Sequence, residues 1–195
     1  MKRYLLIPVF AIAFTFTAAA QTNWSFDQSH TDVGFEVTHL VITDVEGTFK
    51  DYEGTVTTKG DGFENADIAF TVDINSIDTE NEKRDAHLKS DDFFNAEKHP
   101  KMTFKSTSMK KTGENTYKLK GNLTIRGTTK PIELDVVHNG TVQDPWGNTK
   151  AGFRISGELN RFDYGLKWNK MTELGGAVVS KEVRLDIDVQ LMKQA

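Results

Sequence analysis

Apolar residues at every second position dominate the chain from residue 24 onward. Val33, Phe35 and Val37 alternate with polar or small residues, and the same period of two recurs over residues 68–74, 102–108, 117–123, 132–138, 151–157 and 183–191. This alternation is typical of strands with one buried and one solvent-facing side. With residues 49–56 added, the pattern predicts about eight strands and an all-β fold.

Turn-forming residues separate these runs. Glycine-containing or asparagine-containing segments lie at 59–62, 111–115, 126–127 and 139–140, and such residues favour tight connections between neighbouring strands. Short connections predict an antiparallel meander. A sheet of this size either closes into a barrel or folds as a sandwich, because an open edge promotes aggregation.

Residues 78–99 interrupt the strand pattern. Thr79 followed by Glu82 has the spacing of a capping box, which predicts a short helix over about residues 79–94. His99-Pro100 then returns the chain to an extended conformation. We interpret this segment as a helical crossover that covers one end of a barrel.

The crossover combines charged and aromatic residues. Arg84, Asp85 and His87 are followed by Leu88 and by the pair Phe93-Phe94. A solvated helix surface is one interpretation. The other is a lid whose aromatic rings face inward and whose guanidinium meets a polar group.

The first 20 residues have the pattern of a secretory signal. Lys2 and Arg3 precede an apolar run that ends in the small residues Ala18, Ala19 and Ala20. A membrane-spanning helix needs about 20 mostly apolar residues, and Pro8 interrupts this shorter run. We therefore expect cleavage near Ala20/Gln21, no stable membrane insertion, and one periplasmic or secreted domain over residues 21–195.

Charge and cysteine content narrow the function. The formal net charge is −4, and it becomes −6 when the two cations of the signal are removed. Without a block of Lys or Arg, a nucleic-acid partner is disfavoured. The absence of cysteine excludes disulfides, thiolate chemistry and a thioether-linked lipid anchor.

Known catalytic motifs are missing from the sequence. It has no G-x-S-x-G, P-loop or G-x-G-x-x-G motif and no closely spaced histidine pair. We therefore expect no enzyme, no cofactor and no metal. His30 and Asp32, on one side of a predicted strand, are the remaining candidates for a metal or acid-base pair, with a hydrogen-bonded strand end as the alternative.

Several segments together carry a family resemblance: WSFDQSHTDVGFEVTHL (24–40), VEGTF (45–49), INSIDT (74–79), RDAHLKSDDFF (84–94), PKMTF (100–104), GNLTIRG (121–127) and NRFDYG (160–165). In these the chain resembles the YceI-like family of exported, lipocalin-like proteins that bind polyisoprenoid lipids. The family pattern often has Ser where Thr31 stands, which keeps the hydroxyl. The resemblance implies an extended eight-stranded antiparallel barrel, an elongated hydrophobic cavity partly closed by the crossover helix, and no catalytic activity.

The predicted ligand is a long-chain isoprenoid or similar amphiphilic lipid, held in the barrel. Eight-stranded barrels can hold one small ligand, and many of the 13 phenylalanines occupy alternating strand positions. The candidates for the cavity wall, which could equally be ordinary core, are Phe35, Val37, Phe70, Val72, Phe104 and Leu123. The lid candidates are Phe93 and Phe94, and the head-group candidates are Arg84, His87 and Arg161.

Two other functions stay open at this point. One is a solid-barrel interaction or stress-related surface protein without a lipid, whose loop at 144–148 contacts partners. The other is a hydrolase or metal enzyme that uses His30 or His87. The sequence leaves the association state open, a homodimer included.

Overall fold

The computed structural model describes residues 21–60, 62–171 and 177–194. The predicted signal peptide therefore lies outside the described residues. Within the described ranges, no helix has the length and apolar character needed to cross a membrane.

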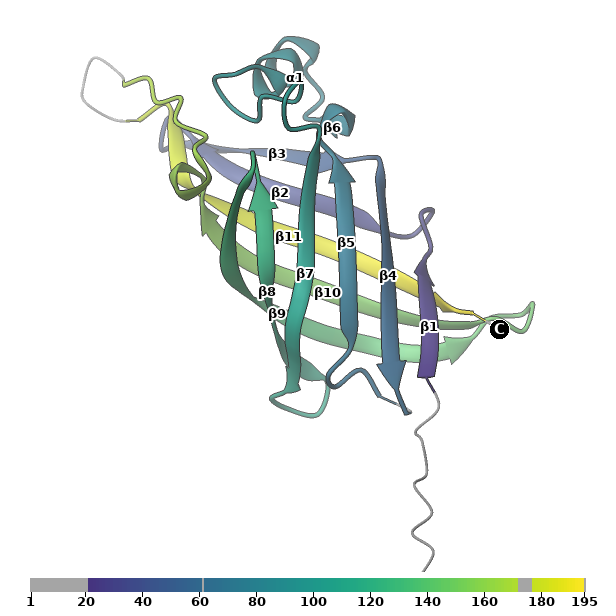
Figure 1. Cartoon of the computed structure of the whole chain (residues 1–195). Helices are drawn as coiled ribbons and strands as arrows, with labels where there is room; N and C mark the ends of the chain where they lie inside the picture. The colour runs from purple at the N-terminus through teal and green to yellow at the C-terminus, as the bar shows by residue number, and fades with distance from the viewer. Residues whose placement is uncertain (1–20, 61, 172–176, 195) are drawn as a thin grey trace, which may run out of the picture.

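Eleven strand segments form a single antiparallel sheet (Figure 1). They are β1 (Gln21–Phe26), β2 (Asp32–His39), β3 (Thr43–Phe49), β4 (Tyr52–Lys59), β5 (Asp67–Asp73), β6 (Ile77–Asp78), β7 (Lys101–Lys111), β8 (Thr116–Ile125), β9 (Thr128–Gln143), β10 (Thr149–Asn160) and β11 (Val179–Lys193).

These segments make a closed barrel of eight strands, as the sequence predicts. β1 and β2 both pair with β11 and act as one interrupted strand. β4 pairs with β1, and β3 pairs with β2. In the same way β5 pairs with β4, and β6 pairs with β3. Pairing of β1 with the end of β11, at Trp24 and Lys193, closes the ring.

The strand predicted over residues 49–56 is interrupted at Lys50 and Asp51. Phe49 and Tyr52 are both buried, although strict alternation would place residues three apart on opposite faces. The break between β3 and β4 resets the alternation, so both aromatic rings face the interior. Lys50 N–H donates to the Ser76 carbonyl across this corner at 3.2 Å.

Helix α1 (Glu82–Lys89) is shorter than the predicted helix over residues 79–94, and the prediction of Thr79 as its N-cap is wrong. Asn81 is the N-cap, and its side chain accepts the Arg84 N–H at 3.0 Å. The Thr79 hydroxyl instead donates to the Asp85 carboxylate, and Glu80 has a left-handed φ of 61°. Residues after Ser90 continue as turns.

Both ends of the barrel are covered by side chains. The crossover that carries α1 lies over one end (Figure 1). At the other end, Phe63 from the β4–β5 loop packs against Trp24 and Phe153, with ring centroids 5.1 and 4.7 Å apart. Two 3₁₀ turns, η1 (Ile74–Ser76) and η2 (Arg161–Tyr164), complete the described elements.

Candidate ligand-binding cavity

The barrel interior contains a cavity of about 140 Å³. Apolar side chains from most strands form its wall. The described residues around it are Phe26, Val33, Gly34, Phe49, Val56, Phe63, Ala66, Ile68, Phe70, Val72, Met102, Thr103, Phe104, Met109, Leu119, Leu123, Ile132, Leu134, Val136, Phe153, Ile155, Leu159, Leu185, Ile187, Val189 and Leu191. Thr103 has the one side-chain oxygen in this set. The residue is exposed, which shows that its hydroxyl faces outward.

Several inward-facing side chains are only partly buried. They include Phe104 on β7, Ile68 on β5 and Ile187 on β11, which pack against the main core yet retain accessible surface. In a solid barrel these positions would be fully buried, because protein interiors are close-packed. Their remaining accessible surface therefore faces the cavity.

Glycines on neighbouring strands help to keep this space open. A Cβ atom at Gly121 would lie 2.3 Å from Phe104 Cζ, and one at Gly54 would lie 2.8 Å from both Phe26 Cε2 and Phe70 Cδ2. The three phenylalanine rings thus occupy the space that side chains at these two glycine positions would take. Large aromatic residues lie along the wall and leave the centre of the barrel empty.

The crossover is fastened to the barrel end by two kinds of contact. Phe93 is buried in a cluster with Leu123 and Tyr164. The Arg126 guanidinium donates to the carbonyls of Asp91 and Phe93 at 2.7 and 2.6 Å and pairs with the Asp91 carboxylate at 2.7 Å. Leu88, Phe94 and the buried Ala96 of the same segment also pack against the core, so the cavity is covered by a segment held by apolar contacts and hydrogen bonds.

The YceI-like domain model matches residues 24–191. The chain belongs to the YceI-like family. It is 39% identical over 197 residues to Protein YceI of Salmonella agona, with all of both chains covered. The crystal structure of the Campylobacter jejuni YCEI protein is 36% identical and has a TM-score of 0.69, covering 87% of this chain and 96% of that one.

A polyisoprenoid binding domain from Saccharophagus degradans has the same fold. Its structure aligns with a TM-score of 0.64 at 17% identity, covering 88% of this chain and 98% of that one. The resemblance identified from sequence segments is confirmed by these comparisons. The eight-stranded architecture is common to this YceI-like chain and its neighbours.

Four of the six predicted lining residues of this YceI-like barrel border the cavity: Phe70, Val72, Phe104 and Leu123. Phe35 and Val37 do not appear among the described residues around it. Phe35 instead packs on Phe49, with ring centroids 5.6 Å apart. β2 extends past the barrel end here, so of its predicted inward positions Val33 alone reaches the cavity.

Several wall residues were not predicted from the sequence. Phe26, Ile155 and Ile187 lie on strands, and the alternating pattern could have included them. Phe63 lies in a loop and Met109 follows an irregular register between Ser106 and Ser108. No strand pattern could have assigned these two residues to the interior.

The predicted lid residues Phe93 and Phe94 pack between the crossover and the barrel, outside the described cavity wall. Phe93 is 6% exposed. Phe94 is half-buried and meets Phe49 edge-on, with ring centroids 6.0 Å apart. Both rings face the barrel end.

Arg161 is buried, and main-chain carbonyls surround its guanidinium. It is 3% exposed, and its guanidinium donates to the carbonyls of Leu166 and Trp168 at 2.7 Å, Ser180 at 2.8 Å and Val179 at 3.3 Å. Burial lowers the pKa of Arg161, although an arginine stays charged in proteins. These bonds tie η2 and the following segment to the start of β11.

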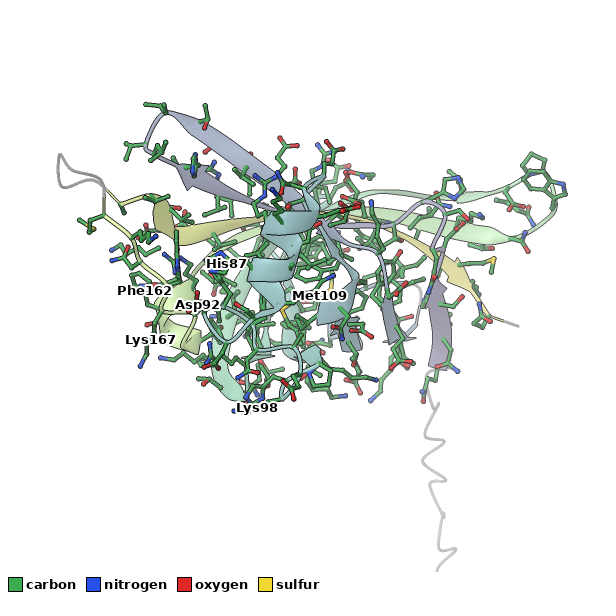
Figure 2. All side chains as sticks on the ribbon, turned by 90° about the horizontal axis from the view of Figure 1, so that it is seen from above. His87, Asp92, Lys98, Met109, Phe162 and Lys167 are labelled. Carbon is green, nitrogen blue, oxygen red and sulfur yellow. The ribbon has the colours of Figure 1, made fainter. Side chains whose placement is uncertain are left out.

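His87 lies at the surface of the crossover, where Figure 2 shows it beside Asp92. Its Nε2 atom is 2.8 Å from Asp92 Oδ2, and its ring meets Phe93 and Trp168 edge-on, with centroids 5.1 and 5.3 Å apart. His87 therefore belongs to the junction between the crossover and the segment after η2.

Arg84 borders a separate polar groove of about 580 Å³. Its Nε and Nη2 atoms donate to the hydroxyl and the carbonyl of Thr79 at 2.7 and 2.6 Å. Neither Arg84 nor His87 nor Arg161 belongs to the described cavity wall. Their role at a lipid head group stays a prediction.

The candidate pair His30 and Asp32 is not formed. His30 Nδ1 lies 3.2 Å from Asp27 Oδ2, while Asp32 accepts a hydrogen bond from the Thr48 hydroxyl at 2.8 Å. The loop between β1 and β2 turns His30 away from the β2 face. Across the described ranges, no cluster of three or more His, Asp or Glu residues has the geometry of a metal site.

Proposed function

We propose that this protein binds the apolar tail of a long-chain amphiphilic lipid, a polyisoprenoid or a similar molecule, and carries or sequesters it outside the cytoplasm. The observation that carries this proposal is a cavity enclosed by apolar side chains. Burial of an apolar tail there is favoured by about 25 cal/mol for each Å² removed from water. The polyisoprenoid binding domain with the same fold supports this ligand class.

The size of the cavity defines how such a tail would fit. At about 140 Å³ it is close to an engineered cavity that binds benzene, and below the roughly 300–1,000 Å³ of ordinary ligand pockets. A long tail therefore has to displace wall side chains. Met102 and Met109 suit this requirement because methionine adapts to irregular shapes, and the partly buried ring of Phe104 has space beside it.

The head group belongs at the crossover end in this proposal. Phe63 and its aromatic neighbours pack tightly at the opposite end, whereas the crossover end has His87 and Arg84 at its surface. A tail that enters past the crossover would leave its polar end near these groups. Both residues would then contact the head group and not the tail.

We infer a periplasmic or secreted location from the signal pattern of residues 1–20. N-terminal sequencing of the exported protein should begin at Gln21 or within a residue or two. A product that retains Met1 would contradict this inference.

The direct test of the ligand is organic extraction of protein purified from its native host, followed by mass spectrometry. We expect an isoprenoid or similar lipid in the extract. When that lipid is added back to delipidated protein, the melting temperature should rise with the logarithm of its concentration. At 100 times Kd the rise should be about 5–10 °C for a domain of this size.

A cavity-filling variant separates the cavity from other lipid-binding surfaces. Ile187→Phe adds a ring at a partly buried wall position of β11 and should remove most of the lipid-induced rise while the barrel stays folded. Val137→Phe adds the same ring on the outside of β9, where Val137 is 43% exposed, and should leave the rise unchanged. Lipid binding by Ile187→Phe at wild-type strength would show that the cavity is not the site.

A further inference from the structure

Three consecutive apolar residues are exposed at the tip of the β2–β3 hairpin. Leu40, Val41 and Ile42 are 37%, 74% and 78% exposed. Met171, which is 57% exposed, lies on the neighbouring segment, because Leu40 N–H donates to the Val178 carbonyl and Val178 N–H donates to the Lys170 carbonyl, both at 2.9 Å. We call Leu40, Val41, Ile42 and Met171 the apolar tip.

The turn at this tip is built from residues that do not suit it. Leu40 and Val41 have left-handed φ values of 52° and 63°, and Ile42 N–H donates back to the His39 carbonyl at 3.2 Å. Two successive positive φ values are typical of a type I′ turn, for which Asn-Gly is strongly preferred. A β-branched residue at positive φ is unusual and strained. The conformation of the turn therefore does not explain why these residues are apolar.

Strained backbone that presents exposed apolar side chains indicates a role in binding. The apolar tip exposes an area on the order of a few hundred Å², below the roughly 800 Å² per partner of a stable protein interface. In both views the hairpin projects beyond the body of the barrel (Figures 1 and 2). A small, projecting apolar surface suits a deformable lipid surface better than a second folded protein.

We propose that the apolar tip docks this protein on a phospholipid bilayer by inserting Leu40, Val41 and Ile42 at the level of the head groups. Without the two cations of the signal, the chain carries a formal net charge of −6, so general electrostatic attraction to anionic lipid does not drive the contact. Docking through the tip depends on apolar area and is reversible.

The position of the tip links docking to the barrel. β2 runs from Val33 in the cavity wall to the hairpin tip, and β3 pairs with β6, which leads into α1. Docking would therefore turn the crossover end of the barrel toward the membrane. The inference goes beyond lipid binding in the cavity and does not require it.

The test is co-sedimentation of the chain starting at Gln21 with neutral phosphatidylcholine vesicles at low and high salt. Wild-type protein should bind the vesicles equally at both salt concentrations. The double variant Leu40→Asn, Val41→Gly should lose about tenfold or more in vesicle partitioning, with an unchanged or higher melting temperature because Asn-Gly suits the turn. Trp146→Ser removes an 83% exposed side chain at the β9–β10 hairpin and should change nothing.

A fluorescent probe gives an independent measurement, because the chain has no cysteine. An environment-sensitive dye on Val41→Cys should shift to the blue when vesicles are added, while the same dye on Val142→Cys, at a residue 64% exposed, should not. Ile187→Phe should dock normally even if it binds no lipid in the cavity.

Three results would overturn the proposal. They are wild-type protein that stays in the supernatant, a tip variant that binds vesicles like the wild type, and loss of binding in Trp146→Ser alone. A blue shift of the Val41 probe that depends on protein concentration without vesicles would assign the tip to self-association.

Discussion

Replacing Phe104 by alanine tests whether the barrel has an empty centre. One face of the Phe104 ring lies against Gly121 of the neighbouring strand, and the residue remains partly accessible beside the cavity. Phe→Ala in a solid core typically costs about 3–5 kcal/mol, because the lost contacts are accompanied by a new void. At Phe104 the void already exists, so roughly half of that cost, about 1.5–2.5 kcal/mol, is expected in the ligand-free protein.

Phe93→Ala is the matched comparison. Phe93 is 6% exposed and packs among Leu123, Ile125, Tyr164 and Leu166 outside the described cavity wall. Its removal should open a new void at the full cost of about 3–5 kcal/mol. The two variants remove the same atoms, so their difference measures the packing around each ring.

Urea unfolding of delipidated protein gives both free energies, provided that the slope m stays constant between variants. In melting temperature, a loss of 1.5–2.5 kcal/mol corresponds to a fall of about 3–10 °C for a domain of this size. Equal losses for Phe104→Ala and Phe93→Ala would refute the reasoning, because they would mean that the Phe104 ring is packed on all sides.

Three further outcomes are expected. Gly121→Ala should lower the melting temperature and weaken lipid binding, because the new Cβ would meet the Phe104 ring and the Lys105 carbonyl; unchanged affinity in a binding titration would argue against a ring displaced into the cavity. Arg161→Lys should lower the free energy of unfolding by about 2–4 kcal/mol, because one ammonium group cannot replace a guanidinium that donates to four carbonyls. A loss below about 1 kcal/mol in urea unfolding would contradict this. The ion pair with Lys150 holds the pKa of Asp27 below its usual 3.8, so the stability that this ion pair contributes is present above about pH 4 and is lost as pH falls. Asp27→Asn should therefore have a lower free energy of unfolding than wild type near neutral pH, and the two free energies should converge in acid. A difference between them that stays constant with pH would contradict this.

The alternating pattern predicted the architecture because a barrel strand has one wet and one dry face. Most strand positions follow from this rule, including Phe70, Phe104 and Leu123 in the cavity wall. The rule failed where the backbone breaks the alternation. Lys50 and Asp51 reset the phase between β3 and β4, and a register shift follows Ser106 on β7; neither leaves a period-two signal.

The polar candidates were harder to assign because residue type does not report partners. Arg161 has the charge of a head-group ligand, yet main-chain carbonyls 5 to 19 residues away along the chain occupy its donors. Thr79 has the spacing of a capping box, yet its hydroxyl donates to Asp85. In both cases the decisive contact comes from three-dimensional packing.

The two barrel ends differ in what has to break before a ligand can enter. At one end Trp24, Phe63 and Phe153 belong to the main core cluster together with residues of five strands or more, so opening there would disrupt the barrel itself. At the other end α1 has no buried side chain. The crossover is held there by the buried residues Phe93 and Ala96 and by the Arg126 hydrogen bonds, with Leu88 and Phe94 packed against the core. Segments with few buried apolar contacts open at a lower free energy than the core. We therefore expect a lipid to enter past the crossover, which hydrogen exchange can test: amides of residues 82–96 should exchange faster than those of β8 and β9, and faster still in Arg126→Ala.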